Sequence, residues 1–429
     1  MSAVQTWEVI VAGFLPAFTS PSFEIFIRMA GGWVLCPGRR TITRVYQFAE
    51  PQGERAHDAY HRFFREGAWS MEALWRLLAK MMVGIFCQKG QILMDLDDTL
   101  FHKSGRKVKG SAWWRDAVSS TGQKVVHAFG LNLVVLTLRV EPPWGGEPLG
   151  LPINMRLHQK NGPSLLELAE EMAREAVSWF PHRDFHLCAD GFYASLAGAD
   201  LPRTHLTSRM RRDAALYQLP PKRRKGQRGR PRKKGKRLPT PEQMAKAKTG
   251  WRRVVVEERG KKKERLLLVR DVIWYKVRPG KLVRLVISRD PQAKQKDDFF
   301  FTTDIESTPQ TVASTYAGRW SIEDTFKNVK QYLGGQDPQT WKEQGPQRAA
   351  AFSLWLYSTI WLFYLKTKGA KPSWIKMPWY TQKNTPSFKD ALAVLRRALW
   401  KDRIFSSSEK QSLKLKNIGP LIEALANAA

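Results

Sequence analysis

Residues 91–190 restrict the possible folds more than any other part of the chain, because strand-like runs follow one another there before a clear helix begins. Four apolar runs predict strands at residues 92–96, 125–128, 132–140 and 151–157. Apolar residues at helical spacing then predict an amphipathic helix over about 164–179. A further apolar run at 185–189 leads directly into Asp190. This order of strands, helix and strand predicts an α/β fold for the middle of the chain.

The charge of the chain points to a polyanionic partner. It carries 71 Lys and Arg against 39 Asp and Glu, a formal net charge of +32, with a pI near 10.2. This balance favours a nucleic acid held by phosphate contacts, with strongly salt-dependent binding. A membrane partner is disfavoured, because the longest apolar stretch, residues 351–365, is shorter than a span requires and reads as a buried core helix. No signal peptide is evident, so we expect a cytoplasmic protein whose Cys36, Cys87 and Cys188 are free thiols.

Helical patterns flank the middle of the chain. Residues 1–90 read as mainly helical, and the clearest helix begins after Ser70, a good N-cap residue. This region is rich in arginine, so a DNA-binding module, a dimerisation module and a simple helical cap all remain open. Residues 336–429 are again predicted to be helical.

Residues 206–300 add material that the order of strands, helix and strand does not need. The run KRRKGQRGRPRKKGKR, residues 222–237, is too charged and too rich in glycine and proline to form a core. Four apolar stretches follow it and predict a small antiparallel sheet, at 254–256, 266–269, 272–277 and 282–287. We therefore expect a basic loop and an inserted β-rich domain, after which residues 301–335 return to the core.

Part of this basic run, Arg228-Gly229-Arg230-Pro231, is similar to the centre of an AT-hook, in which an extended Arg-Pro segment enters the minor groove of A/T-rich DNA. The alternative is a solvated loop that grips phosphates without sequence preference. Either interpretation makes Arg228, Arg230 and Arg232 candidate DNA contacts.

A polar stripe is predicted on a single helix between Thr308, its N-cap, and Gly334-Gly335, its stop signal. At about 100° per residue, four side chains return to one face of this helix: Tyr316, Arg319, Glu323 and Lys330. The carboxylate can hold a metal ion, while the cations and the phenol can grip phosphates beside it. The alternative is an exposed helix carrying an ordinary Arg–Glu pair. The apolar residues of the same helix are expected to supply its packing surface: Trp320, Ile322, Phe326 and Val329.

Three acids occupy positions that suit a two-metal phosphodiester site. Asp97 follows the first strand, Asp190 follows the strand after the helix, and Glu323 lies on the polar stripe. Two-metal hydrolysis needs carboxylates that hold two divalent ions about 4 Å apart, and hard oxygen ligands suit Mg²⁺ or Mn²⁺. Asp95 and Asp98 compete for the first position, and an Asp after a strand is often only a turn former.

These residues together resemble the bacterial insertion-sequence DDE transposases. The stripe matches the YREK signature of that family, Y-x2-R-x3-E-x6-K, at every position. Leu96-Asp97-Asp98-Thr99 matches the context of the family's first acid, and Ala189-Asp190-Gly191-Phe192-Tyr193 matches that of the second. The resemblance covers roughly residues 91–335.

The resemblance implies an enzyme that binds terminal inverted repeats, cleaves the element ends by two-metal hydrolysis and joins them to target DNA. The core would have an RNase H-like fold over residues 91–205 and 301–335, and its three acids would hold two Mg²⁺ or Mn²⁺ ions. Tyr316, Arg319 and Lys330 would contact DNA near the cleaved end. Such transposases work as homodimers in a synaptic complex, here in a bacterial cytoplasm and on the nucleoid. They often stack an aromatic side chain of the insertion on a flipped base, for which the candidates are Trp251, Trp274 and Phe299.

Two other functions compete with this interpretation. Residues 92–99 also resemble the first motif of haloacid-dehalogenase-like phosphatases, DxDxT, in which Asp95 would be the nucleophile and Asp97 the general acid/base. That fold requires alternating strands and helices, whereas consecutive strands follow residues 92–99 here. The phosphatase interpretation also explains neither the net charge nor the polar stripe. The second competitor is a DNA-binding protein without catalytic activity.

Overall fold

The computed structural model describes residues 1–221, 230–369, 371–374, 378, 381–406 and 415–428. Its centre is a ten-stranded mixed sheet with the order β2-β3-β1-β5-β6-β10-β9-β8-β7, and β4 also pairs with β3. The strands are β1 (Ile92–His102), β2 (Ala112–Arg115), β3 (His127–Val140), β4 (Leu149–His158), β5 (Phe185–Ala189), β6 (Thr204–Arg209), β7 (Arg252–Glu258), β8 (Lys261–Val272), β9 (Val283–Arg289) and β10 (Asp298–Thr302).

The first part of the sheet has the arrangement expected of an RNase H-like core. β1, β3 and β4 are antiparallel neighbours, and α6 (Leu165–Ser178) then leads into β5, which runs parallel to β1. The predicted helix and β5 are therefore confirmed, and Ser164 caps α6 as a capping box with Glu167. The predicted strands at 125–128 and 132–140 are one continuous strand, β3, and the short β2 was not predicted.

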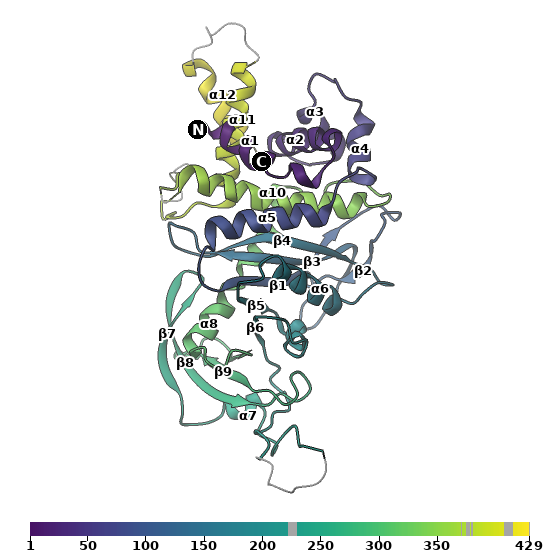
Figure 1. Cartoon of the computed structure of the whole chain (residues 1–429). Helices are drawn as coiled ribbons and strands as arrows, with labels where there is room; N and C mark the ends of the chain where they lie inside the picture. The colour runs from purple at the N-terminus through teal and green to yellow at the C-terminus, as the bar shows by residue number, and fades with distance from the viewer. Residues whose placement is uncertain (222–229, 370, 375–377, 379–380, 407–414, 429) are drawn as a thin grey trace.

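The strands after residue 250 continue this same sheet. β7, β8 and β9 are antiparallel neighbours (Figure 1). β10 pairs antiparallel with β9 on one side and with β6 on the other. A strand predicted at 272–277 is wrong, because β8 ends at Val272 and Ile273 forms only an isolated bridge with Tyr217. The short α7 (Pro241–Met244) precedes β7, and β10 was not predicted.

Helices cover the sheet from both ends of the chain, as predicted. They are α1 (Ala3–Ala12), α2 (Ser20–Leu35), α3 (Ile42–Ala49), α4 (His57–Arg65), α5 (Met71–Phe86), α10 (Gly345–Lys368), α11 (Phe388–Ser406) and α12 (Leu415–Asn427), with one 3₁₀ turn, η1 (Leu15–Ala17). The apolar stretch 351–365 is buried inside α10, as predicted. In the described part of the chain, no helix is long and apolar enough to cross a membrane.

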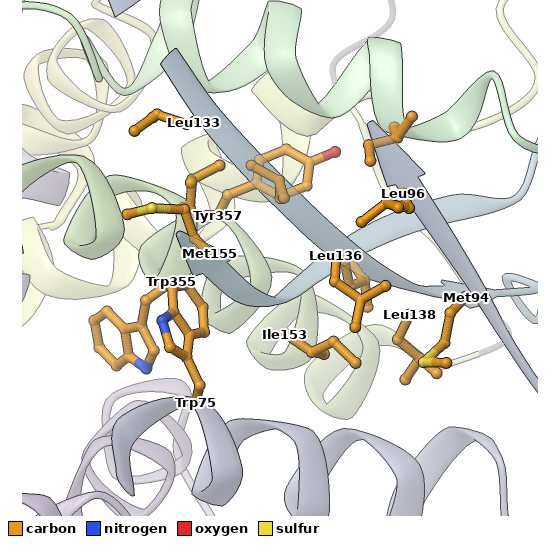
Figure 2. Packing of buried hydrophobic residues seen from close by; sticks show 14 of the residues in the cluster. Trp75, Met94, Leu96, Leu133, Leu136, Leu138, Ile153, Met155, Trp355 and Tyr357 are labelled. Atoms are coloured by element: carbon orange, nitrogen blue, oxygen red, sulfur yellow. The ribbon is translucent and has the colours of Figure 1, made fainter. Parts of the chain in front are cut away.

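The core joins these terminal helices to the sheet. Both α5 and α10 pack against β4. Figure 2 shows Trp75 of α5 and Trp355 of α10 near Ile153 and Met155 of β4, and all four side chains are almost completely buried. The three cysteines are free thiols; Cys36 is part of this core, and Cys188 is also buried.

The polar stripe lies on two helices, so the prediction of a single helix was wrong. α8 (Pro309–Gly318) begins at Thr308, whose hydroxyl accepts a hydrogen bond from Thr311 N, and α9 (Ser321–Tyr332) follows after two residues. Between them, backbone N–H groups bond three residues back, as in Arg319 N to Tyr316 O at 3.1 Å and Glu323 N to Trp320 O at 3.0 Å. This 3₁₀ spacing tightens the turn between the two helices.

Candidate active site

Arg319 connects two of the three candidate acids. Its Nη1 lies 2.7 Å from Asp97 Oδ2 on β1, and its Nη2 lies 2.8 Å from Glu323 Oε1 on α9. The Arg319 side chain is about nine-tenths buried, whereas the Glu323 side chain is one-third exposed. Arg319 is placed for this contact by the tight turn between α8 and α9, which no local sequence pattern revealed.

The third acid, Asp190, lies beside Asp97. β1 and β5 are parallel neighbours, and Leu96 of β1 pairs with Ala189 of β5. Asp97 and Asp190 are the next residues after this pair, one on each chain segment. The Asp190 side chain caps the 3₁₀ helix η2 (Gly191–Gly198) by accepting a hydrogen bond from Phe192 N at 2.9 Å. The structure therefore brings Asp97, Asp190 and Glu323 to one end of the β1–β5 pair.

The electrostatics of Asp97 show how crowded this group of acids is. Burial, together with the nearby Asp190 and Asp98 carboxylates, raises the pKa of Asp97 to about 7 against the opposing charge of Arg319. A carboxylate in such surroundings is stabilised by a nearby cation. The Asp97 site thus favours binding of positive charge.

The two competing aspartates have other surroundings. Asp95 is completely buried, forms a two-point ion pair with Arg139 and accepts a hydrogen bond from Ser321 Oγ at 3.2 Å. Asp98 lies on the opposite face of β1 from Asp97, where it accepts a hydrogen bond from the Tyr193 hydroxyl at 2.9 Å. A buried, paired Asp95 has no surface to offer a substrate, which disfavours the phosphatase interpretation, as does the antiparallel pairing of β1 with β3.

A cleft of about 520 Å³ opens beside Arg319 and Glu323, between α8–α9 and the strands β8–β10. Five cations line it, Arg209, Arg259, Lys263, Arg265 and Arg319, against three acids, Glu258, Asp298 and Glu323. Its aromatic lining consists of Phe300, Tyr316 and Trp320. Trp320 is 39% exposed, and the Arg259 guanidinium lies 3.8 Å from the centre of its ring. Cations and an accessible aromatic ring together suit a nucleic-acid ligand.

The other residues of the polar stripe are more enclosed than the sequence suggested. Tyr316 is only 7% exposed, and its ring stacks on Phe300 at 4.6 Å between centroids. Lys330 is half-buried, with its Nζ 5.9 Å from the centre of the Phe101 ring, and burial lowers its pKa. Lys330 therefore borders the site, while Tyr316 contributes mainly to packing beneath the cleft.

The three aromatic residues that the sequence offered for base stacking do not face this cleft. Trp274 and Phe299 are each 5% exposed. The Trp251 ring is half-buried, donates its Nε1 hydrogen to Ala247 O at 2.8 Å and is covered by Arg289. The accessible aromatic ring of the cleft is that of Trp320, which the sequence had assigned to the packing side of the helix.

The described residues of the basic run, 230–237, do not line this cleft. Arg230 and Arg232 are exposed, whereas Arg228 lies outside the described residues. Their assignment as DNA contacts stays a prediction.

The donor chemistry of the site fits divalent metal ions. Asp97, Asp190 and Glu323 supply the carboxylate oxygens that Mg²⁺ and Mn²⁺ prefer, and two of them, Asp97 and Glu323, already bind the Arg319 cation. Among the described residues, no group of three or more acids, histidines or cysteines is close enough to hold a metal ion. Release of at least one carboxylate by Arg319 would therefore have to accompany metal binding.

Comparison with known proteins agrees with this geometry. A family model described as DDE superfamily endonuclease matches residues 29–275, which is more than half of the chain and includes Asp97 and Asp190. The match ends before α8, so it does not include Glu323. No curated protein matches the chain. From the extent of the family match, the chain belongs to the DDE superfamily endonucleases.

Proposed function

We propose that this endonuclease is a bacterial insertion-sequence transposase with a YREK signature. It binds terminal inverted repeats, cleaves the element ends by two-metal phosphodiester hydrolysis and joins them to target DNA. The observation that carries the proposal is the Arg319 bridge between Asp97 and Glu323, beside Asp190 and at the mouth of a basic cleft. This arrangement combines candidate metal ligands with a surface for phosphates.

In this proposal the three acids hold two Mg²⁺ or Mn²⁺ ions, which when bound activate water and stabilise the leaving oxygen. Asp97 and Asp190 fix one side of the site through the rigid β1–β5 pair, and Glu323 approaches from the first turn of α9. Arg319 neutralises the acids in the free enzyme. In the described structure the Nε of Arg319 is a buried donor without a partner. On substrate binding Arg319 turns part of its guanidinium toward a phosphate in the cleft.

DNA binding in this proposal uses several surfaces. The cleft cations Arg209 and Arg259 hold the strand next to the scissile phosphate, and the Trp320 ring supports a base. Lys330 contacts DNA on the other side of Glu323, and Arg230 and Arg232 add phosphate contacts from the basic run. The strands β7–β10 act as the inserted domain, and the helices of residues 1–90 bind DNA or a second copy of the chain in a homodimeric synaptic complex on the nucleoid.

The proposal is tested with DNA that carries the inverted repeat flanking the gene. Asp97→Asn, Asp190→Asn and Glu323→Gln should each abolish Mg²⁺-dependent cleavage while end binding persists, because each removes one anionic ligand with little change of shape. Asp98→Asn is the matched control, since Asp98 lies on the other face of the same strand. Near-normal cleavage by one of the three variants would remove that residue from the triad. Binding without cleavage in any metal would instead favour a non-catalytic DNA-binding protein.

A further inference from the structure

Trp113 is unusually accessible for a tryptophan on a strand. It lies on β2, at the edge of the sheet, and is 61% exposed, the largest exposed fraction of any described tryptophan. Its ring meets the Phe129 ring edge-on, at 5.8 Å between centroids. Nothing in the proposed chemistry uses this side chain, and packing does not explain it.

The strand register places Trp113 on the same face of the sheet as Asp97. Asp97 pairs with Val135 of β3, and Trp113 pairs with Phe129 of the same strand. Directly paired residues share a face, and positions six residues apart on one strand do so as well. At about 3.4 Å per residue, Trp113 lies roughly 20 Å from Asp97 along this face.

Lys330 lies between these two positions. Its Nζ is over the ring of Phe101, which pairs with Leu131 and shares the face of Asp97. The Asp116 carboxylate, which immediately follows β2, lies close enough to Lys330 to influence its titration. Glu323, Lys330 and the end of β2 therefore follow one another over this face.

The charge around Trp113 is strongly positive. Residues 102–127 contain six Lys and Arg and one acid, Asp116, which is buried and bonded to His102 and Ser119. Four of the cations are exposed and form no ion pair within the described chain: Arg106, Lys107, Arg115 and Lys124. A second copy of this chain, itself at +32, is electrostatically disfavoured here, whereas a polyanion is favoured.

We propose that Trp113 and Arg115 bind single-stranded DNA that leaves the active site past Lys330. Trp113 stacks on an unpaired base, and Arg115, on the same face of β2, holds a neighbouring phosphate. The path from the active site rests on the proposed function, whereas the binding surface itself does not. At roughly 20 Å from Asp97, the stacked base lies several nucleotides from the scissile phosphate.

The test measures binding of a fluorescein-labelled oligothymidine of about 20 nucleotides to the full chain by anisotropy, in EDTA so that no cleavage occurs. Trp113→Ala should weaken binding on the order of 5- to 100-fold, and Trp113→Phe should restore most of it. Arg115→Gln should weaken binding and reduce its salt dependence. The control Lys80→Gln removes an exposed charge on α5 and should leave both the affinity and its salt dependence nearly unchanged.

A direct readout is photo-crosslinking of the same oligonucleotide carrying 5-iododeoxyuridine, followed by identification of the modified peptide. A crosslink at Trp113 is the expected result. Unchanged affinity of Trp113→Ala together with no crosslink there would overturn the proposal, as would a loss of dimer in that variant without a loss of DNA affinity. Trp113-dependent binding by a protein that never cleaves element ends would refute the proposed function and leave this surface standing.

Discussion

The buried pair of Asp95 and Arg139 gives the sharpest prediction about this fold. The carboxylate of Asp95 is completely buried and is bonded by Arg139 Nε at 3.1 Å, by Arg139 Nη2 and by Ser321 Oγ. Arg139 Nη1 also donates to Thr315 O at 2.7 Å. The pair thus connects β1 and β3 to both α8 and the start of α9.

Asp95→Asn should destabilise the protein by about 3–5 kcal/mol, because it leaves the Arg139 guanidinium buried without a counter-charge. This is a large part of the roughly 5–15 kcal/mol that stabilises a typical domain. The double variant Asp95→Leu with Arg139→Met should recover much of the loss, since it removes both charges and keeps apolar volume. Asp213→Asn, which breaks the exposed pair with Arg211, should leave the free energy of unfolding nearly unchanged.

The assay is urea unfolding followed by tryptophan fluorescence, for which the chain offers 17 reporters, together with thermal melting. We expect the order of stability to be wild type and Asp213→Asn, then the double variant, then Asp95→Asn. An Asp95→Asn protein that unfolds like wild type would refute the argument from burial. If that protein had also lost a phosphatase activity present in the parent, Asp95 would be a nucleophile and the phosphatase interpretation would be correct.

Four further predictions concern the site and its charge. Arg319→Gln should lower the melting temperature of the metal-free protein and increase the upward shift that Mn²⁺ produces, because the acids lose their internal cation; equal shifts in both proteins would contradict this. Asp97 has a pKa of about 7 in the folded state against an ordinary 3.8, so between these pH values the folded state binds one more proton than the unfolded state. The stability of the metal-free protein should therefore fall as the pH rises from 3.8 to 7. Asp97→Asn should abolish this part of the pH dependence, and a variant with an unchanged pH profile would contradict the prediction. Lys330→Ala should reduce strand joining more than stability, and early melting would make Lys330 structural. Deletion of residues 222–237, which removes eleven Lys and Arg, should flatten the salt dependence of DNA binding, and an unchanged slope would show that the run does not contact DNA.

Local patterns predicted those elements whose signals are local. The N-cap Ser70, the bounds of β5 and the N-cap Thr308 all lie in short windows whose residue types have a direct physical meaning. β10 was missed although its residues 299–301 are three consecutive phenylalanines, because a short apolar run can be a strand or part of a buried helix.

The geometry of the site could not be predicted in this way, because its decisive contact joins residues far apart in sequence. Arg319 leaves helical hydrogen bonding at a point where its sequence neighbours would allow one continuous helix, and it does so beside Asp97, 222 residues away. A helix-stripe argument correctly selected Arg319 and Glu323 as an i,i+4 pair, but it put Trp320 on a packing face. The turn instead exposes Trp320 to the cleft under Arg259.

The break between α8 and α9 is therefore the feature on which the proposed chemistry depends. In one straight helix, residues 316 and 330 would be about 21 Å apart along the axis, and all four stripe residues would face one flat surface. With the break, Tyr316 packs on Phe300 of β10. Arg319 forms its ion pair with Asp97 of β1, and Glu323 lies in the first turn of a new helix. Acid and cation then meet in a recess beside Asp190, where a metal ion or a phosphate can compete for them. A substitution that straightened this turn without touching an acid would accordingly remove the site while leaving its residues in place.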